Sequence, residues 1–203
     1  MPPQINPIHH RKHLRDARLA AREALPENQR QVFNERIVEH LAGLLARLDP
    51  RILAFCWPYR AEPDLRALVA TWLAGNPARC ATIPVVVEKA TPMAFRQWWP
   101  GAPMGADRHG IPIPADTPAL TPEVVVIPLN AFDDKGYRLG YGGGYFDRTL
   151  EILHPPPVKV GVAFEVARVD STLPQAHDHP MDWIVTEAGV FRPASGERPP
   201  GRT

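Results

Sequence analysis

The chain has 203 residues, 44% of them hydrophobic and 22% charged, which is ample for one sizeable domain with its own core. Its 23 lysines and arginines nearly balance 22 acidic residues, so no global field would recruit nucleic acid or a membrane surface. The opening MPPQINPIHHRK lacks the apolar segment of a secretory signal, and no apolar run is long enough to span a bilayer. We therefore expect a cytoplasmic protein that uses neither a membrane nor nucleic acid.

The two cysteines, Cys56 and Cys80, are far apart and form no CxxC pair. Cys56 lies in the apolar run ILAFCW and is typical of a small core residue in a reducing compartment. We expect a loose segment over residues 1–9, a single domain over residues 10–192 and a loose Pro/Gly-rich tail over residues 193–203.

The first third of the chain predicts two helices, a strand and a third helix. Good helix formers fill residues 9–25, and Pro26 ends that segment. The following segment carries an apolar stripe at helical spacing, made of Phe33, Ile37, Leu41, Leu44 and Leu48. A buried strand is expected over residues 51–57. Residues 64–77 then form a helix with inward Leu65, Leu68, Trp72 and Leu73 and with Gly75 near its end.

The remaining two thirds are rich in strands. We expect them in CATIPVVVE, MAFRQWW, PEVVVIPL, KVGVAF and MDWIVTE, with a helix over YFDRTLEIL. PEVVVIPL is almost wholly apolar and β-branched, which is typical of a parallel strand covered on both faces. The alternation predicts an α/β fold: a three-layer sandwich with a largely parallel central sheet flanked by helices. Such sheets bind ligands at the carboxyl ends of their strands.

A glycine-rich segment, GYRLGYGGGYFDR, follows PEVVVIPL and opens the helix near Tyr145. Glycines admit positive φ and close backbone approach, so successive N–H groups and the helix start can hold a phosphate. Arg138 can add a charged donor, and Asp147 is better explained as a Mg²⁺ ligand than as a phosphate contact. The alternative is a tight surface turn with Asp147 in solvent.

Arginines also form one stripe along the first predicted helix, because Arg11, Arg15, Arg18 and Arg22 are spaced four, three and four apart. This stripe is either a solvated face or a cationic arm over a polyphosphate. We expect Arg18 and Arg22 to be surface residues.

Three further stretches are candidates for a site. WPYRAEPD leaves a strand end with Glu62 and Asp64, which could bind planar N–H donors or cap the next helix. Trp98 and Trp99 could wall a pocket or pack in the core. HDH, residues 177–179, could suggest zinc, but no third and fourth ligands can be named.

The stretch AFDDKGYRLGYGGGYFDRTL resembles the signature of the 5-formyltetrahydrofolate cyclo-ligase family, also called 5,10-methenyltetrahydrofolate synthetases. Weaker marks follow the same order: RKHLR, EPD, FRQW, HGIPIP and HDHPMDWIVTE. The resemblance runs from about residue 10 to about 190. It implies an ATP- and Mg²⁺-dependent enzyme that converts 5-formyltetrahydrofolate to 5,10-methenyltetrahydrofolate, with no obligate protein partner.

The resemblance also implies roles for individual residues. Its catalytic residues would be Arg138, Tyr145 and Asp147, and Asp147 with Asp178 would hold Mg²⁺. ATP would bind Arg11, Lys12, Arg15, Arg138, Leu139, Gly140, Tyr141, Gly142, Gly143, Gly144, Tyr145 and Phe146. The folate substrate would contact Tyr59, Glu62, Asp64, Trp98, Tyr141 and Tyr145.

The sequence departs from the family pattern in three places. Arg11 stands where the family has Lys, which leaves open whether Arg11 or Lys12 contacts the nucleotide. Phe146 replaces a Tyr and loses its hydroxyl, and YRA replaces glycines before the acidic residues.

The implied reaction phosphorylates the formyl oxygen, after which N10 attacks the activated carbon and phosphate leaves. The alternatives are an inactive relative that binds folate or RNA, and another ATP-dependent ligase or kinase on the same fold.

Overall fold

The computed structural model describes residues 7–193. Its helices are α1 (Pro7–Glu23), α2 (Glu27–Leu48), α3 (Arg66–Ala74) and α4 (Tyr145–Ile152), with a 3-10 turn, η1, at Glu165–Ala167. Its strands are β1 (Ile52–Ala54), β2 (Cys80–Val85), β3 (Ala94–Trp98), β4 (Met104–Ala106), β5 (Pro112–Pro114), β6 (Val124–Pro128), β7 (Ala131–Phe132), β8 (Arg138–Leu139), β9 (Val158–Val162), β10 (Trp183–Thr186) and β11 (Gly189–Phe191).

One seven-stranded sheet organises the chain, in the order β11-β10-β9-β6-β1-β2-β3. The five strands from β10 to β2 run parallel, and the edge strands β11 and β3 pair antiparallel to their neighbours. β6 lies at the centre, as its continuous apolar sequence predicts for a strand buried on both faces. The expected α/β fold with a largely parallel sheet is confirmed.

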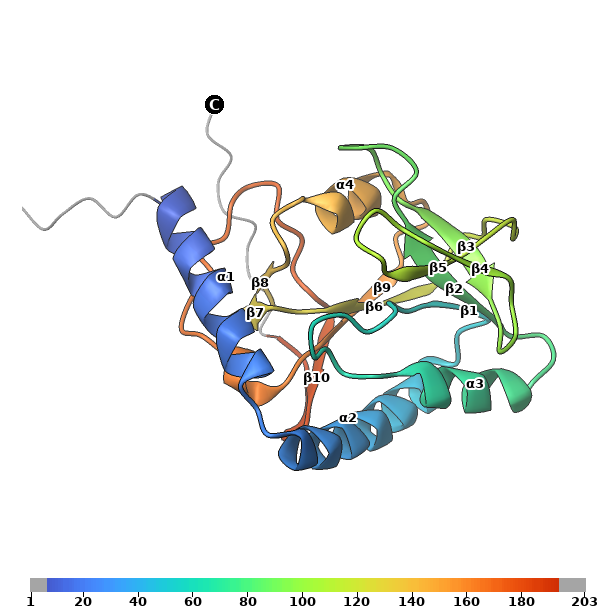
Figure 1. Ribbon diagram of the computed structural model, residues 1–203, viewed down its shortest axis with the longest axis horizontal. Coiled ribbons are helices and arrows are strands. Elements are labelled where there is room, and N and C mark those ends of the chain that lie inside the picture. The colour runs from blue at the N-terminus through green and yellow to red at the C-terminus, as the bar shows by residue number, and fades with distance from the viewer. Residues whose placement is uncertain (1–6, 194–203) are drawn as a thin grey trace, which may run out of the picture.

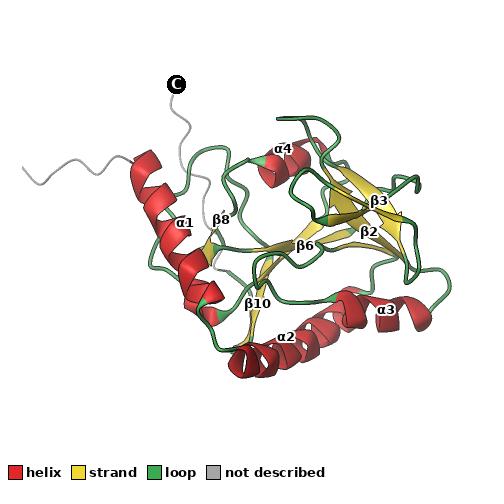
Figure 2. Ribbon diagram, viewed as in Figure 1, coloured by secondary structure: helices red, strands yellow, loops and turns green. Residues whose placement is uncertain are grey.

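Helices cover the sheet on both faces (Figure 1). On one face, the apolar stripe of α2 packs with α3 against alternate residues of the strands, and Ile37, Leu41 and Leu44 are fully buried. On the other face, Leu150 of α4 packs against the opposite side chains of β6, Val125 and Ile127. The two helical layers on either side of the strands are visible in Figure 2.

Two small hairpins were not expected from the sequence, because elements of two or three residues show no periodicity. β4 pairs with β5, and β7 pairs with β8. The second hairpin matters for the site, since it turns the chain between β6 and the glycine-rich segment. Asp133 holds it: Oδ1 accepts from the N–H groups of Lys135 and Tyr137, and Oδ2 accepts from Thr172.

Helix α1 belongs to neither main layer. It lies beside β7 and η1, at the end of the sheet toward which β6 runs (Figure 1). It begins at Pro7, so residues 7–9 are helical where a loose segment was expected. The remainder of both expected loose ends lies outside the described residues, apart from Pro193. No helix within residues 7–193 is long and apolar enough to cross a membrane.

Candidate active site

Residues 140–144 of the glycine-rich segment connect β8 to α4 and are called the glycine loop below. Gly142 and Gly144 have φ of +91° and +63°, a region that favours glycine, and Gly144 immediately precedes the first residue of α4. A β-carbon on Gly142 would lie 3.1 Å from the guanidinium of Arg15. Glycine at 142 is thus required both by the backbone conformation and by the close approach of α1.

Two arginines, one from α1 and one from α4, donate hydrogen bonds to backbone carbonyls of this segment. Arg15 of α1 donates from Nε to the carbonyl of Gly140 at 2.6 Å, and Arg148 of α4 donates from Nη2 to the carbonyl of Gly143 at 2.6 Å. The sequence indicated Arg15 but not Arg148, whose position in the first turn after Gly144 was the signal available. The carbonyls therefore face guanidinium groups, and the cationic stripe of α1 reaches the glycine loop.

Arg138 and Asp147 form a pair behind the loop. Arg138 is buried and donates from Nη2 to Asp147 Oδ1 at 2.9 Å and from Nη1 to the carbonyl of His179 at 2.7 Å. The N–H of His179 also donates to Asp147 Oδ1, at 3.3 Å. Only the second oxygen of Asp147 is left without a partner among the described residues.

Arg11 and Asp178 form a second, more complete pair. Arg11 donates from Nη1 to Asp178 Oδ2 at 2.6 Å and from Nη2 to Oδ1 at 3.2 Å, and it also reaches the carbonyl of Leu173. The N–H of Gln175 donates to Asp178 Oδ2 as well. Lys12 is exposed and makes no hydrogen bond or ion pair within residues 7–193.

The carboxylates fit a Mg²⁺ ion unequally. No three His, Cys, Asp or Glu side chains gather into a metal-holding group in the described part of the chain. Mg²⁺ needs only one or two carboxylates when nucleotide phosphates supply other oxygens, and Asp147 has an oxygen to offer. Asp178 does not, because both of its oxygens accept from Arg11. The zinc alternative also lacks support, since His177 is exposed and His179 pairs with Glu151 at 3.0 Å.

A third arginine–carboxylate pair joins α1 to the turn after β1 that carries Glu62, here called the acidic turn. Arg22 is only 2% exposed, so our expectation that it lies on the surface is wrong. It donates from Nε to the carbonyl of Arg60 at 3.0 Å and from Nη2 to the hydroxyl of Tyr141 at 2.9 Å. Its Nη2 lies 3.8 Å from Glu62 Oε1, which accepts from the same hydroxyl at 2.9 Å. Helical spacing placed Arg22 on the correct stripe without revealing that the stripe faces polar partners.

The turn before Glu62 has a backbone conformation that glycine adopts more readily than other residues. Arg60 and Ala61 both have left-handed φ, at +48° and +58°. Side chains adopt this region at a cost, and Arg60 is held there by the Arg22 contact to its carbonyl and by its own ion pair with Glu23. Glu62 then turns inward, with the backbone N–H of Tyr59 donating to Oε2 at 3.1 Å.

Burial changes the chemistry of Glu62. Loss of solvation raises its pKa to about 6, although the charge of Arg22 and the donors on Tyr141 and Tyr59 act in the opposite direction. Burial and the neighbouring Glu62 also raise the pKa of Tyr141. The Tyr141 hydroxyl therefore stays protonated and donates a hydrogen bond to Glu62.

Asp64 plays the capping role that the sequence allowed. Its Oδ1 accepts from the N–H of Arg66, the first residue of α3, at 3.0 Å, and the two side chains pair at 2.6 Å. Asn34 also bonds both backbone groups of Asp64. Of the two acidic residues, Glu62 is therefore the one that meets the glycine loop.

Of the aromatic candidates, Tyr145 lies beside the glycine loop, whereas Phe146 and Trp98 pack against or within the hydrophobic core. The ring of Tyr145 lies under the guanidinium of Arg148, 5.1 Å from the ring centroid, and its hydroxyl is 3.4 Å from Arg108. Phe146 packs against the core on the α4 side. Trp98 is buried in the core on the α2 side, 5.1 Å from Phe55 and 6.4 Å from Trp57 between ring centroids.

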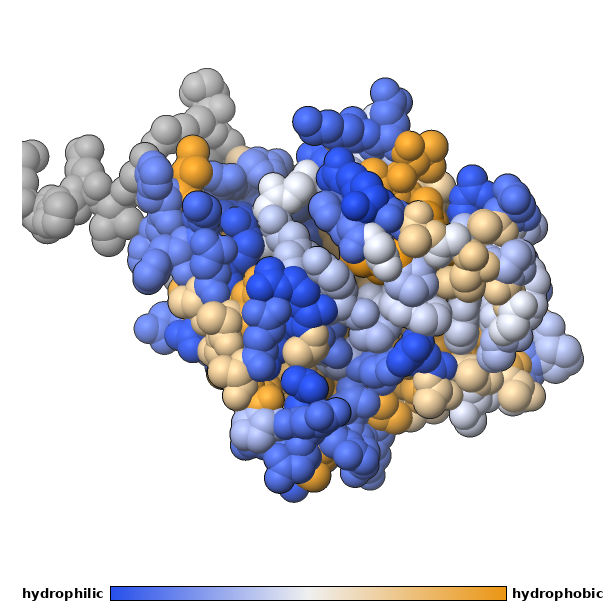
Figure 3. All heavy atoms as spheres, in the orientation of Figure 1, coloured by the Kyte–Doolittle hydropathy of each residue, from blue (hydrophilic) through white to orange (hydrophobic). Residues whose placement is uncertain are grey.

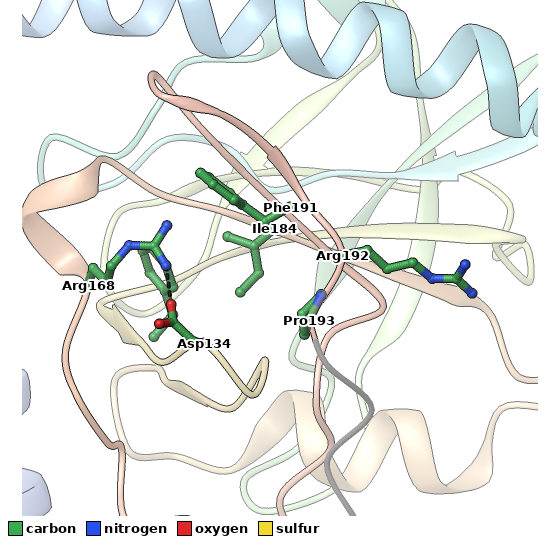
Figure 4. Close-up of a pocket in the computed structure, with 7 residues that line it drawn as sticks. Asp134, Arg168, Ile184, Phe191, Arg192 and Pro193 are labelled. Atoms are coloured by element: carbon green, nitrogen blue, oxygen red, sulfur yellow. Dashed lines mark hydrogen bonds and ion pairs between the residues drawn. The ribbon is translucent and has the colours of Figure 1, made fainter.

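The glycine loop and the α1 stripe lie apart from a cavity of about 520 Å³ beside β7, β10 and β11 (Figure 4). Arg168 projects into that cavity, where it is paired with Asp134 and lies over the rings of Phe132 and Phe191. None of the candidate site residues lines it. Figure 3, in the same orientation as Figure 1, shows mostly hydrophilic side chains over the α1 side of the molecule.

Comparisons with known proteins identify the family of this chain. The family model described as the 5-formyltetrahydrofolate cyclo-ligase family matches residues 7–187. A 5-formyltetrahydrofolate cyclo-ligase of Mycolicibacterium smegmatis is 30% identical over 182 residues, covering 85% of this chain and 91% of the relative. That of Escherichia coli K12 is 28% identical and covers 84% and 96%.

A solved structure extends the likeness to the fold. The NMR structure of Aquifex aeolicus 5,10-methenyltetrahydrofolate synthetase superposes with a TM-score of 0.78 at 28% identity, covering 92% of this chain and 94% of that one. The family match over residues 7–187 contains α1, the acidic turn and the glycine loop, and it ends just before β11. The chain belongs to the 5-formyltetrahydrofolate cyclo-ligase family.

Proposed function

We propose that this chain catalyses the ATP-dependent cyclisation of 5-formyltetrahydrofolate to 5,10-methenyltetrahydrofolate, with release of ADP and phosphate. Family membership over residues 7–187 supports the overall reaction. The observation that carries the nucleotide assignment is the glycine loop at the start of α4, whose carbonyls accept hydrogen bonds from Arg15 and Arg148. Backbone N–H groups in such a loop and at a helix start bind phosphate oxygens.

The chemistry needs an activated formyl oxygen. The formamide carbon on N5 is a poor electrophile, and its oxygen is a poor leaving group. Transfer of the γ-phosphoryl group from ATP to this oxygen gives an imidate phosphate and ADP. N10 then attacks the carbon, the C–O bond breaks with its electron pair on phosphate, and N10 releases its proton. Positioning and charge neutralisation are the protein's main contributions to such a transfer.

The residues of the loop and of α1 divide this work. The segment from Leu139 to Phe146 would cradle the phosphates, with Arg15, Arg148 and Arg138 offsetting their charge. The guanidinium of Arg11 is already paired with Asp178. The side chain of Lys12 is exposed and has no partner within residues 7–193, so the arrangement favours Lys12 as the nucleotide contact. Tyr145, beside Gly143 and under Arg148, would border the transferred group.

Asp147 is the residue that would hold Mg²⁺, through the oxygen that Arg138 leaves unpaired. The ion, when bound with the nucleotide, would neutralise charge on the transferring phosphoryl group. Asp178 stays a predicted second ligand, but its saturated pair with Arg11 favours a structural role.

On the folate side, Glu62, Tyr59 and Tyr141 are the residues that the geometry favours. The rings of Tyr59 and Tyr141 lie 5.8 Å apart, next to the buried Glu62 carboxylate. Asp64 is engaged at the α3 cap, and Trp98 lies in the core, so both contribute to the pocket's framework in this proposal. We also propose a cytoplasmic location, which the two free cysteines support.

The decisive experiment is absorbance of the methenyl product after mixing the protein with 5-formyltetrahydrofolate, with and without Mg-ATP. We expect the chromophore only when both are present, and its absence with correctly folded protein would refute the activity. Asp147→Asn should lower the rate by more than a hundredfold while the thermal midpoint of the free protein changes little. Unchanged formation of the chromophore by that variant would refute the metal assignment.

A further inference from the structure

Arg22 is a buried cation whose hydrogen bonding is incomplete. Its side chain is 2% exposed, and α1 places it between the acidic turn and the glycine loop. Nε and Nη2 have partners, but Nη1 is buried with no hydrogen-bond partner among the described residues. An unmet donor on a buried guanidinium is costly. Other arginines among the described residues also have a buried Nε without a partner, but Arg22 is the one that lies beside a buried carboxylate, that of Glu62.

Tyr141 joins this cation to Glu62 through a single hydroxyl. The hydroxyl accepts from Arg22 at 2.9 Å and donates to Glu62 Oε1 at 2.9 Å. Tyr141 is also part of the glycine loop, and 46% of the residue remains exposed although its hydroxyl is in the network. The side chain of Tyr141 therefore links the glycine loop to the acidic turn through its hydroxyl, while the residue stays partly exposed.

Glu62 is surrounded by a small and well-defined set of groups. Arg22 faces it from α1, the Tyr141 hydroxyl from the glycine loop and the N–H of Tyr59 from its own turn, and Cys56 from the end of β1 is also close enough to interact. Its side chain is only 3% exposed. The Tyr141 hydroxyl and the Tyr59 N–H hold its two oxygens in one orientation, and the rings of the two tyrosines lie 5.8 Å apart.

We propose that Arg22 and Tyr141 are positioning residues that hold the Glu62 carboxylate for recognition of the pterin ring. The pterin edge presents an amino group and a ring N–H next to a carbonyl oxygen. A carboxylate beside an arginine with a spare N–H matches that order of donors and acceptor. The open side of Tyr141 and the neighbouring Tyr59 supply ring surfaces for a flat ligand. This inference rests on the proposed cyclo-ligase function and adds residues that set its folate affinity.

The test is Tyr141→Phe, which removes the hydroxyl and keeps the ring. Steady-state rates should show a rise of about tenfold in the KM for 5-formyltetrahydrofolate, the usual effect of losing a hydrogen bond to a charged group. The KM for ATP should change less than about twofold, because the phosphate contacts are made by backbone N–H groups and arginines. An equal rise in both KM values would mean that the hydroxyl merely orders the loop. An unchanged or lower folate KM would also overturn the proposal.

The pH profile provides a readout that a purely structural role would not move. Tyr141 donates to the ionised form of Glu62, so its loss should raise the pKa of that carboxyl. The acidic limb of kcat/KM for the folate should then move to higher pH in Tyr141→Phe. A limb in the wild-type position would contradict the assignment.

A double-mutant cycle with Glu62→Gln guards against unrelated effects. Tyr141→Phe should add less than about twofold to the folate KM once Glu62 is neutral, since the two residues act through one hydrogen bond. Full additivity would refute the coupling. Arg22→Lys should raise the folate KM, whereas Arg18→Lys, one turn earlier on the same helix with only the Val166 carbonyl as partner, should not. Chromophore formation by the wild type remains the separate test of the function itself, so failure of one is distinguishable from failure of the other.

Discussion

The two ends of α1 are tied to the body by arginine–carboxylate pairs of different kinds. Arg11 and Asp178 meet directly at 2.6 Å, and every oxygen of Asp178 accepts a hydrogen bond. Arg22 and Glu62, about 16 Å further along the helix axis, are 3.8 Å apart with a tyrosine hydroxyl between them. The first pair is complete without a ligand, and the second keeps an unused donor. The contrast indicates that the Arg11 pair anchors α1, whereas in our proposal the Arg22 pair is available to a ligand.

The largest effect should come from breaking the complete pair. Arg11→Met leaves Asp178 buried without its cation, so we expect a loss of about 3 kcal/mol in the free energy of unfolding. Chemical denaturation measures it. Asp49→Asn, which removes the largely exposed partner of Arg79 and tolerates the left-handed backbone there, is the control and should cost below about 1 kcal/mol. Equal losses in the two variants would remove the distinction between anchor and surface pair.

The second pair should be visible in the pH dependence of stability. The pKa of Glu62 is raised to about 6, so the folded protein binds its proton more tightly than the unfolded chain does. The stabilising contribution of this proton is fully present below pH 4.5 and is lost as the pH rises to about 6, an effect of about 2 kcal/mol. Comparing denaturation at pH 4.5 and pH 7 for the wild type and Glu62→Gln measures it. A variant with the same pH dependence as the wild type would show that Glu62 is not the group responsible.

Between the two pairs, Arg15 meets the glycine loop at Gly142. Gly142→Ala would crowd that guanidinium, and we expect the apparent Kd for Mg-ATP to weaken about tenfold, equivalent to about 1.4 kcal/mol. Nucleotide protection in a thermal-shift titration reports it. Gly101→Ala is the control, because Gly101 has a similar φ of +89° with no atom within 4 Å of the added carbon. If both variants lost protection equally, backbone strain rather than the cradle would be the cause.

The smallest effect concerns the strained turn that presents Glu62. Ala61→Gly relieves a left-handed alanine at φ +58° and should stabilise the fold by about 0.5 to 1 kcal/mol. Denaturation midpoints would reveal it. A destabilised Ala61→Gly protein would show that the greater conformational entropy of glycine in the unfolded chain outweighs the strain relieved at this position.

Much of the fold could be predicted because its signals are periodic or compositional. The stripe of α2 and the β-branched run of β6 each depend on many residues that agree, and both are found where expected. The hairpin β7–β8 and the strand β11 could not be predicted, because they contain only two or three residues. The hairpin is also held by a side-chain contact distant in sequence, that of Asp133 with Thr172.

The candidate site divides in the same way. The glycine segment and its neighbours could be recognised because their residue types are unusual in combination. Arg22 could not, since a periodicity of 3.6 gives the face of a helix and not the polarity of whatever covers it. The choice between Glu62 and Asp64 likewise needed the left-handed turn at Arg60 and Ala61, which aims one carboxylate inward and leaves the other at the α3 cap.

The manner in which α1 docks has a consequence for solution behaviour. Leu19 is the only fully buried hydrophobic residue of this helix in the described chain, and the helix is otherwise held largely by guanidinium contacts from Arg11, Arg15, Arg18 and Arg22. These guanidinium groups are buried or half-buried, and dissolved ions screen such contacts much less than they screen exposed pairs. Electrolyte concentration should therefore leave α1 attached over the glycine loop, and exposed pairs such as Arg60 with Glu23 should weaken first.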